Sequence, residues 1–73
     1  MEKKDFNILF GKALKLEREK RSISQSELAK MCFKDRQYLH LLENGSVTPT
    51  FFTIYLICRE LNIDVSVLMP KDF

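Results

Sequence analysis

The stretch from Ile23 to Gly45 constrains the fold of this chain more than any other. Ser24 and Glu27 form a capping-box pattern. In that pattern the serine hydroxyl accepts a hydrogen bond from the backbone N–H three residues later, and the glutamate carboxylate accepts one from the backbone N–H of the serine. Apolar residues then recur at the spacing of one helix face, at Leu28, Ala29 and Cys32. The pattern predicts a short helix over residues 25–31.

A second short helix is predicted over residues 36–43. Asp35 is a preferred N-cap residue, and Leu39 and Leu42 lie on one helix face. Asn44 and Gly45 end the pattern, because glycine readily adopts the left-handed conformation found at helix C-termini. Two short helices joined by a turn of three or four residues have a helix-turn-helix layout.

These residues resemble the helix-turn-helix of the phage-repressor/Cro (XRE) family of DNA-binding proteins. The resemblance covers roughly residues 10–68. The matching residues are Phe10, Gly11, Leu14, Arg18, Ser24, Gln25, Glu27, Leu28, Ala29, Arg36, Tyr38, Leu39, Leu42, Glu43, Asn44, Gly45, Pro49, Thr53, Ile54 and Leu61. The resemblance implies an all-α fold, a compact five-helix lambda-repressor-like DNA-binding domain with the helix-turn-helix at helices 2 and 3. The small size is similar to that of the controller proteins of restriction–modification systems.

The length predicts one small domain, and the resemblance implies that it is a single helix-turn-helix DNA-binding domain over residues 1–73. Hydrophobic residues make up 45% of the chain, which favours a folded chain over a disordered one. The net charge of +2 is a weak nucleic-acid signal unless the basic residues gather on one face. No apolar run is long enough to cross a membrane and no secretory leader is visible, so we expect a cytoplasmic protein.

The two cysteines, Cys32 and Cys58, fall on apolar faces of predicted helices. Free cysteine commonly behaves as a small buried hydrophobe; redox sensing or a disulfide is the alternative. His40 is the single histidine, which leaves no Cys/His spacing for zinc. The sequence also lacks a nucleophile–base arrangement and a Gly-rich phosphate loop, so we expect no enzyme, cofactor or small-molecule ligand.

If Leu39 and Leu42 point inward, the second helix of the motif has an unusual outer face. Arg36 can bridge the two acceptors of guanine, and Gln37 can read adenine with two hydrogen bonds. Leu41 can contact a thymine methyl group, and His40 can donate to a base or a phosphate, although a lone exposed histidine is more often inert. Tyr38 can offer its hydroxyl to a phosphate while its ring leans on the core. This helix is therefore predicted to read DNA.

Contacts to the phosphate backbone are predicted on both sides of that helix. The resemblance implies that Gln25 binds a phosphate at the start of the first motif helix, where the alternative is a solvent-exposed residue. Asn44 and Ser46 follow the second helix, where polar side chains and backbone N–H groups can meet the DNA backbone. Relatives often carry Lys or Arg in this exit loop, so we expect fewer charge contacts and a shallower salt dependence here.

The corner between the two helices departs from the family at Phe33 and Lys34. Relatives usually place a small residue, often glycine, at the first position, and a positive φ is costly for a bulky residue. Either the turn has a different geometry, or Phe33 joins the core and Lys34 is released to solvent. Lys34 would then lie near the DNA backbone.

Arg18 and Glu43 are predicted to form a structural ion pair. The resemblance pairs them, and a guanidinium can bind a carboxylate through two hydrogen bonds. A glutamate near a helix C-terminus is otherwise disfavoured by the helix dipole. The alternative is that Arg18 is one more surface charge. The neighbouring charges are read as a solvated face: Lys12, Lys15, Glu17, Glu19 and Lys20.

Two longer helices flank the motif. The first is predicted over residues 5–20 and directs one apolar face toward the core, formed by Phe6, Phe10, Ala13 and Leu14. The other begins after Thr50, a preferred N-cap residue, and ends near Asn62. Its stripe of Phe51, Ile54, Ile57, Cys58 and Leu61 is extended by Phe52, Tyr55 and Leu56 beyond what one core face needs. The surplus aromatic residues suggest an additional contact.

A last short helix is predicted over residues 65–69, capped by Asp64 and stopped by Pro70. The segment is apolar for its length, with Val65, Val67, Leu68, Met69 and Phe73. These residues either close the core or form a contact between two copies of the chain. The resemblance favours a homodimer with Val65, Val67, Leu68 and Met69 in its interface.

These observations together predict a sequence-specific transcriptional regulator that binds a near-palindromic operator in double-stranded DNA as a homodimer. The alternative is a protein-interaction module on the same fold, such as an antitoxin or an adaptor. The weak net charge and the missing basic exit loop favour that alternative somewhat.

Overall fold

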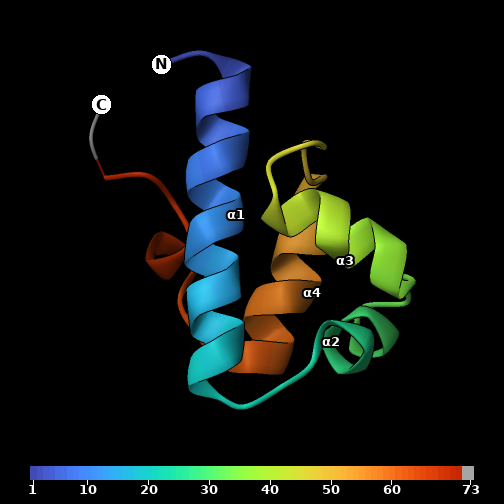
Figure 1. The fold of residues 1–73 in the computed structure, drawn as a ribbon. Coiled ribbons are helices and arrows are strands. Elements are labelled where there is room, and N and C mark those ends of the chain that lie inside the picture. Colours follow the sequence, from blue (N-terminus) through green and yellow to red (C-terminus); the bar gives the residue numbers. More distant parts are fainter. Residues whose placement is uncertain (72–73) are drawn as a thin grey trace.

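The computed structural model describes residues 1–71 and is all-helical over that range. Four α-helices and one 3₁₀ helix follow one another (Figure 1): α1 Lys3–Lys20, α2 Gln25–Met31, α3 Arg36–Glu43, α4 Phe51–Leu61 and η1 Val65–Val67. The predicted bounds of α2 and α3 are confirmed, and α1 begins two residues earlier than predicted. Each described helix is too short or too polar to cross a lipid bilayer.

The helix starts follow the sequence pattern closely. Ser24 Oγ accepts from the backbone N–H of Glu27 at 3.0 Å, and the Glu27 carboxylate accepts from the N–H of Ser24 at 2.8 Å. The Asp35 carboxylate caps α3 at 2.8 Å and the Thr50 hydroxyl caps α4 at 3.1 Å. Such caps satisfy N–H groups that have no partner inside the helix. The predicted caps are therefore confirmed.

The prediction of a fifth α-helix is wrong. Residues 65–67 form a 3₁₀ helix, in which the N–H of Val67 donates to the carbonyl of Asp64 at 3.0 Å, three residues back. The Asp64 carboxylate accepts from the N–H of Ser66 at 2.9 Å. Pro70 disfavours the α conformation at the residue before it, so the segment is too short to establish the four-residue hydrogen bonds of an α-helix.

The core lies where α1, the two motif helices and α4 meet. In Figure 1, α2 and α3 stand on one side of α1, and the C-terminal segment lies on the other. The buried apolar side chains come from the four α-helices, from Cys32 directly after α2 and from Leu68 directly after η1: Phe10, Leu14, Leu28, Ala29, Cys32, Leu39, Leu42, Ile54, Leu56, Ile57, Leu61 and Leu68. This core holds α3 with one face inward and the other free.

Gly11 allows α1 to approach the end of α3 unusually closely. A Cβ atom at this position would lie 2.5 Å from the backbone carbonyl oxygen of Glu43 and 2.6 Å from that of Leu42. No real side chain tolerates such a distance to backbone atoms. The missing side chain therefore sets the spacing between α1 and the last turn of α3.

The corner between α2 and α3 keeps a left-handed residue although that residue is Phe33. Its φ is +59° and its side chain is 79% exposed. The idea that Phe33 joins the core is therefore wrong. Lys34 is exposed, and its backbone N–H donates to the carbonyl of Ala29 at 2.8 Å. The turn thus adopts a conformation that suits glycine, with a large aromatic side chain directed into solvent.

Candidate nucleic-acid interface

The outer face of α3 carries the residues predicted to read bases. Leu39 and Leu42 are fully buried beneath it, while Arg36, Gln37 and His40 are exposed. The helix therefore presents a guanidinium, an amide and an imidazole together on one surface. Tyr38 and Leu41 are half-buried at its edges.

Lys34 lies beside the first turn of α3. Its ammonium nitrogen is 4.9 Å from the centroid of the Tyr38 ring, a distance typical of a cation–π contact. The contact keeps the lysine ammonium group near the start of the helix. A positive charge therefore lies over Tyr38, near the start of α3.

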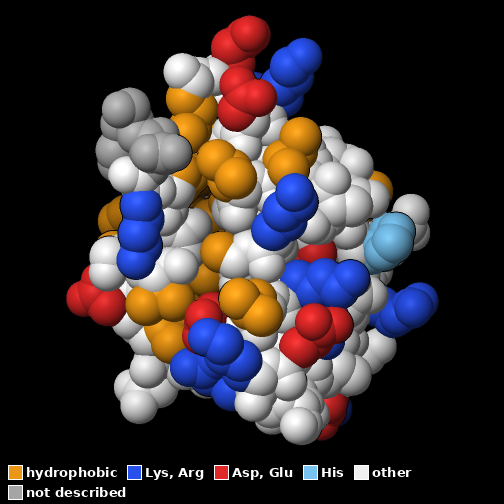
Figure 2. Space-filling model, turned by 60° about the vertical axis from the view of Figure 1, so that its left-hand side comes forward, with side chains coloured by type: hydrophobic (Ala, Val, Ile, Leu, Met, Phe, Trp, Pro, Cys, Tyr) orange, Lys and Arg blue, Asp and Glu red, His pale blue; other side chains and the backbone are white. Residues whose placement is uncertain are grey.

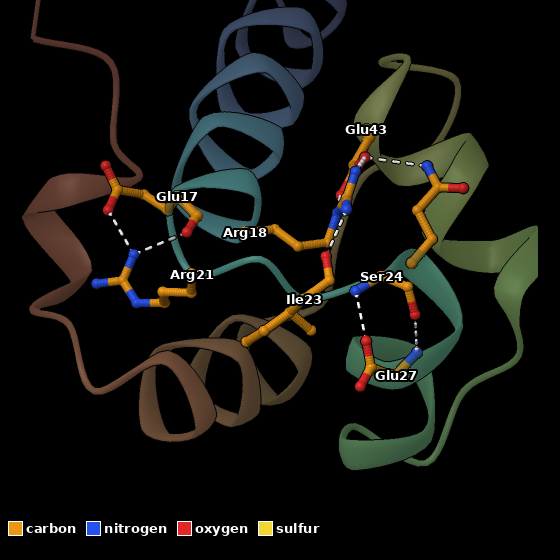
Figure 3. Close-up of polar contacts among 8 residues, drawn as sticks. Glu17, Arg18, Arg21, Ile23, Ser24, Glu27 and Glu43 are labelled. Atoms are coloured by element: carbon orange, nitrogen blue, oxygen red, sulfur yellow. Dashed lines mark hydrogen bonds and ion pairs between the residues drawn. The ribbon is translucent and has the colours of Figure 1, made fainter.

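Arg18 and Glu43 form a buried network at the other end of α3 (Figure 3). Arg18 Nε donates to Glu43 Oε2 at 2.7 Å and Arg18 Nη2 donates to Glu43 Oε1 at 3.0 Å. Arg18 Nη1 also donates to the carbonyl of Ile23 at 2.7 Å, at the entry to α2. Hydrogen bonding to Glu43 raises the pKa of Arg18 above its usual value. One guanidinium thus ties α1 to both helices of the motif.

Gln25 joins this network, which the sequence did not reveal. Its Nε2 donates to Glu43 Oε1 at 3.0 Å. An amide nitrogen has two hydrogens, so one remains available after this bond. The predicted phosphate contact by Gln25 would use that second hydrogen, from a side chain whose position the ion pair already fixes.

Asn44 and Ser46 lie exposed in the loop after α3. The Asn44 side-chain oxygen accepts from the backbone N–H of Ser46 at 3.0 Å and also from the Ser46 hydroxyl. The oxygen end of the amide is therefore occupied within the loop. The NH₂ end of Asn44 remains a donor toward solvent.

A hollow of about 220 Å³ opens between α1, the start of α2 and the end of α3. It is lined by Lys12, Lys15, Gln25, His40, Glu43 and Asn44. The sequence placed both lysines on a solvated face of α1, because helical periodicity does not tell which exposed residues lie beside another element. Both lysines are exposed, as predicted, and the structure also places them next to three of the predicted DNA-binding residues.

The C-terminal segment divides into exposed and buried parts. Val65 is 45% exposed, Val67 and Met69 are half-buried, and Leu68 has no exposed surface. Leu68 therefore belongs to the core of the single chain, while the other three residues reach the surface. Phe73 lies outside the described residues. Figure 2 shows apolar side chains spread between charged ones over the face that includes α1 and the C-terminal segment.

Three aromatic residues of α4 are exposed. Phe52 and Tyr55, the predicted surplus residues, are 64% and 53% accessible. Phe51 is 84% accessible, so its predicted place in the apolar stripe is wrong. The rings of Phe52 and Tyr55 stack at a centroid distance of 6.3 Å. Leu56, expected to extend this surplus area, is instead buried at 3% exposure. An aromatic surface thus remains on α4 near a second hollow, lined by Tyr55, Cys58, Arg59, Asn62, Ile63, Asp64 and Val65.

Both cysteines are free thiols. Burial raises the pKa of Cys32 to about 11. Burial and the charge of Asp64 also raise the pKa of Cys58. A raised pKa lowers the thiolate population on which cysteine reactivity depends. Among residues 1–71 no group of three or more His, Cys, Asp or Glu side chains is arranged to hold a metal ion.

Comparison with known proteins identifies relatives of this chain. A family model described as Helix-turn-helix matches residues 14–68. The ImmF control region 10 kDa protein of Bacillus phage phi105 is 34% identical over 62 residues, which cover 85% of this chain and 69% of the phage protein. Both matches include the whole of the predicted motif.

Solved structures share the fold. The restriction-modification controller protein C.AhdI from Aeromonas hydrophila superposes with a TM-score of 0.81 at 27% identity, covering 85% of this chain and 94% of the controller protein. The clp gene regulator ClgR from Corynebacterium glutamicum gives 0.82 at 24% identity over 85% of this chain and 66% of that protein. Hydroxypropylphosphonic acid epoxidase from S. wedmorenis gives 0.83 at 23% identity over 89% of this chain. The match spans 35% of the epoxidase, so that likeness concerns the fold alone.

Proposed function

The chain belongs to the helix-turn-helix family of phage-repressor (XRE) type, and from that premise we propose that it is a sequence-specific transcriptional regulator. It binds a near-palindromic operator as a homodimer, with α3 in the major groove of each half-site. The observation that carries the proposal is the outer face of α3, where Arg36 and Gln37 are exposed over a buried leucine face.

Arg36 and Gln37 read base edges in this proposal. An arginine binds the two major-groove acceptors of guanine, and a glutamine binds the acceptor and donor of adenine. Both residues lie in the first turn of α3, which is the part of a recognition helix that reaches the bases. Leu41 and His40 lie farther along the helix, where they contact a thymine methyl group and a base or phosphate, respectively.

Polar groups around α3 hold the protein in register on the DNA backbone. Lys34, fixed over Tyr38, is adjacent to the start of the helix. The NH₂ groups of Gln25 and Asn44 are near its end, where Ser46 follows. Contacts of this kind position a protein on DNA without reading its sequence. Their small number of charges accounts for an expected shallow salt dependence.

The homodimer uses the apolar surface of the C-terminal segment. Val65, Val67 and Met69 are at least partly accessible. Tyr55 of α4 and Val65 line the same hollow, so the aromatic surface of α4 lies near this segment. Two-fold symmetry sets two recognition helices about 34 Å apart, one turn of the double helix. A regulatory role is supported by the names of two relatives, a phage control-region protein and a restriction-modification controller protein.

The test is selection from random duplex DNA, followed by titration of the selected duplex at two salt concentrations. A palindromic site with half-sites about one turn apart is expected. Arg36→Ala and Gln37→Ala should each weaken binding and relax the base preference at one position per half-site. Lys20→Ala, which removes an exposed charge from α1, is the control and should leave the base preferences unchanged.

Failure to enrich any sequence would contradict the proposal. Weak, salt-sensitive binding without base preference would leave only general affinity for a polyanion. The protein would then be better explained as an interaction module that docks a partner on its apolar surface.

A further inference from the structure

The hollow between α1, α2 and α3 is a built feature of this fold. Gly11 brings the first helix against the last turn of α3, and the Arg18–Glu43 pair fixes that arrangement. Lys12 and Lys15 extend from α1 along one wall, while His40 and Asn44 come from α3 and the loop after it. The hollow therefore lies beside the C-terminal end of the recognition helix.

The charge of this hollow is positive. Glu43 is the one acidic residue in its lining, and both of its carboxylate oxygens accept hydrogen bonds from Arg18, with a third bond from Gln25. Its charge is thus balanced by the buried guanidinium. Lys12 and Lys15 form no ion pair with any acidic group of residues 1–71. Two uncompensated ammonium groups remain.

Donors predominate among the free polar groups around the hollow. Each lysine ammonium has three N–H groups and no acceptor. The Gln25 amide has a second hydrogen beyond the one given to Glu43, and the Asn44 amide turns its oxygen toward Ser46. Donors with positive charge form their strongest hydrogen bonds with anionic oxygens. The hollow fits a small oxyanion with several acceptor oxygens.

We propose that Lys12 and Lys15 contact the DNA phosphate that Gln25 and Asn44 meet at this hollow in the proposed function, so that the DNA contact extends from the helix-turn-helix onto the first helix. The inference rests on the proposed function. Phosphates of both strands border the major groove in which α3 would lie. Figure 2 shows Lys and Arg side chains gathered beside the histidine on this face. These lysines supply charge that the exit loop Ser46–Thr48 lacks.

The first test measures the salt dependence of operator binding for wild type, Lys12→Gln, Lys15→Gln and the double variant. Each lost phosphate contact should reduce the slope of log affinity against log salt by about 0.9. For two contacts, the loss of affinity between 50 and 200 mM salt should be roughly 12-fold smaller than in wild type. Lys20→Gln is the matched control, because Lys20 belongs to the same helix and pairs with Glu17 outside the hollow.

The second test identifies the phosphate. Single phosphodiesters of the operator are replaced in turn by neutral methylphosphonates. One replacement near each half-site should weaken binding of wild type and of Lys20→Gln severalfold, and should weaken the double variant much less. Such non-additivity is the signature of two groups in direct contact. A free anion as ligand would instead show as competition by inorganic phosphate at constant ionic strength, with no such operator position.

The outcomes separate the inference from the proposed function. If wild type selects and binds an operator while the double variant matches Lys20→Gln in salt slope and methylphosphonate response, the inference is wrong and the regulator stands. If competition by inorganic phosphate replaces the operator-specific effect, the hollow binds a free anion and the inference is also wrong. If wild type selects no sequence, the proposed function fails first. Circular dichroism of each variant checks that the fold is retained.

Discussion

Arg18 and Glu43 join α1 to the last turn of α3 through two hydrogen bonds of 2.7 and 3.0 Å. Gln25 reaches the same carboxylate from α2, so three helices converge on one acidic side chain. The Glu43 side chain is 3% exposed and the Arg18 side chain 10%. Water therefore contributes little to solvating the Glu43 carboxylate. The negative charge is stabilised mainly by the Arg18 guanidinium.

Arg18→Ala should strongly destabilise the fold. The substitution leaves a buried carboxylate without its ionic partner, which typically costs about 3 to 5 kcal/mol. Urea denaturation followed by circular dichroism measures the loss. Replacing both partners by apolar residues, as in Arg18→Met with Glu43→Leu, should recover part of it, because no charge is then left buried. A thermal melt unchanged by Arg18→Ala would disprove the dependence of Glu43 on Arg18.

Phe33→Gly should stabilise the protein. Phe33 has a φ of +59° and is 79% exposed, so glycine relieves the left-handed strain and gives up little buried surface. The expected gain is about 1 kcal/mol, reduced by the greater freedom of glycine in the unfolded chain. Denaturant unfolding measures it.

Two other residues allow a check on the Phe33 prediction. Ser22→Gly, at a φ of +55°, should also stabilise, whereas Asn62→Gly, at +56°, should gain less because asparagine tolerates this region. A loss of stability in Phe33→Gly would mean that the exposed ring makes a favourable contact that offsets its strain.

The parts of the fold that the sequence predicted well are local along the chain. Ser24 and Asp35 accept hydrogen bonds from backbone N–H groups three residues away, so both partners can be identified within a short stretch of sequence. The periodicity of α2 and α3 is equally local. The last segment was harder, because three or four apolar residues before a proline do not distinguish a 3₁₀ turn from an α-helix. They also could not show that Leu68 is buried while Val65 is exposed.

The candidate site depends on contacts between residues distant in sequence, which periodicity does not contain. Gln25 meets Glu43 across 18 positions, and only family resemblance suggested the contact of Glu43 with Arg18 across 25. Lys12 and Lys15 fit the pattern of an exposed helix face, and that pattern is the same whether or not another helix lies nearby. Gly11 is the one residue that could have indicated the close approach of α1 to α3, because a glycine inside a helix often lies where another backbone passes near.

Cys32 should be inert toward thiol reagents in the folded protein. Its side chain is 1% exposed and its pKa is raised to about 11, so roughly a thousandth of the thiol is ionised at pH 8. In a Cys58→Ser background, reaction with a coloured disulfide reagent at pH 8 should be slow and should accelerate sharply in urea. Fast reaction under native conditions would instead favour a redox-sensing role for this residue.

Arg36 and Lys34 should fail in different ways when substituted. Arg36→Ala should lower affinity for the selected operator by about 1 to 3 kcal/mol and relax the preference at one base pair, because it removes a base contact. Lys34→Ala should weaken binding to all duplexes alike and reduce the salt slope by about one. Competition of each variant against a panel of single-base operator variants measures both effects. Equal behaviour of the two variants would contradict the separate roles.

Val65→Asp should separate dimer formation from folding. Val65 is 45% exposed and contributes to the apolar surface of the C-terminal segment, so an aspartate there leaves the core intact but places a charge in the proposed interface. Leu68 is unsuitable for this purpose, since its side chain is fully buried and a charge there would unfold the chain.

Met31→Asp, at a residue 39% exposed on α2, is the matched control. Sedimentation should show Val65→Asp as a folded monomer with weakened operator affinity and Met31→Asp as a dimer. A dimer that survives Val65→Asp with unchanged affinity would place the contact between copies elsewhere, with the stacked Phe52 and Tyr55 of α4 as the next surface to test.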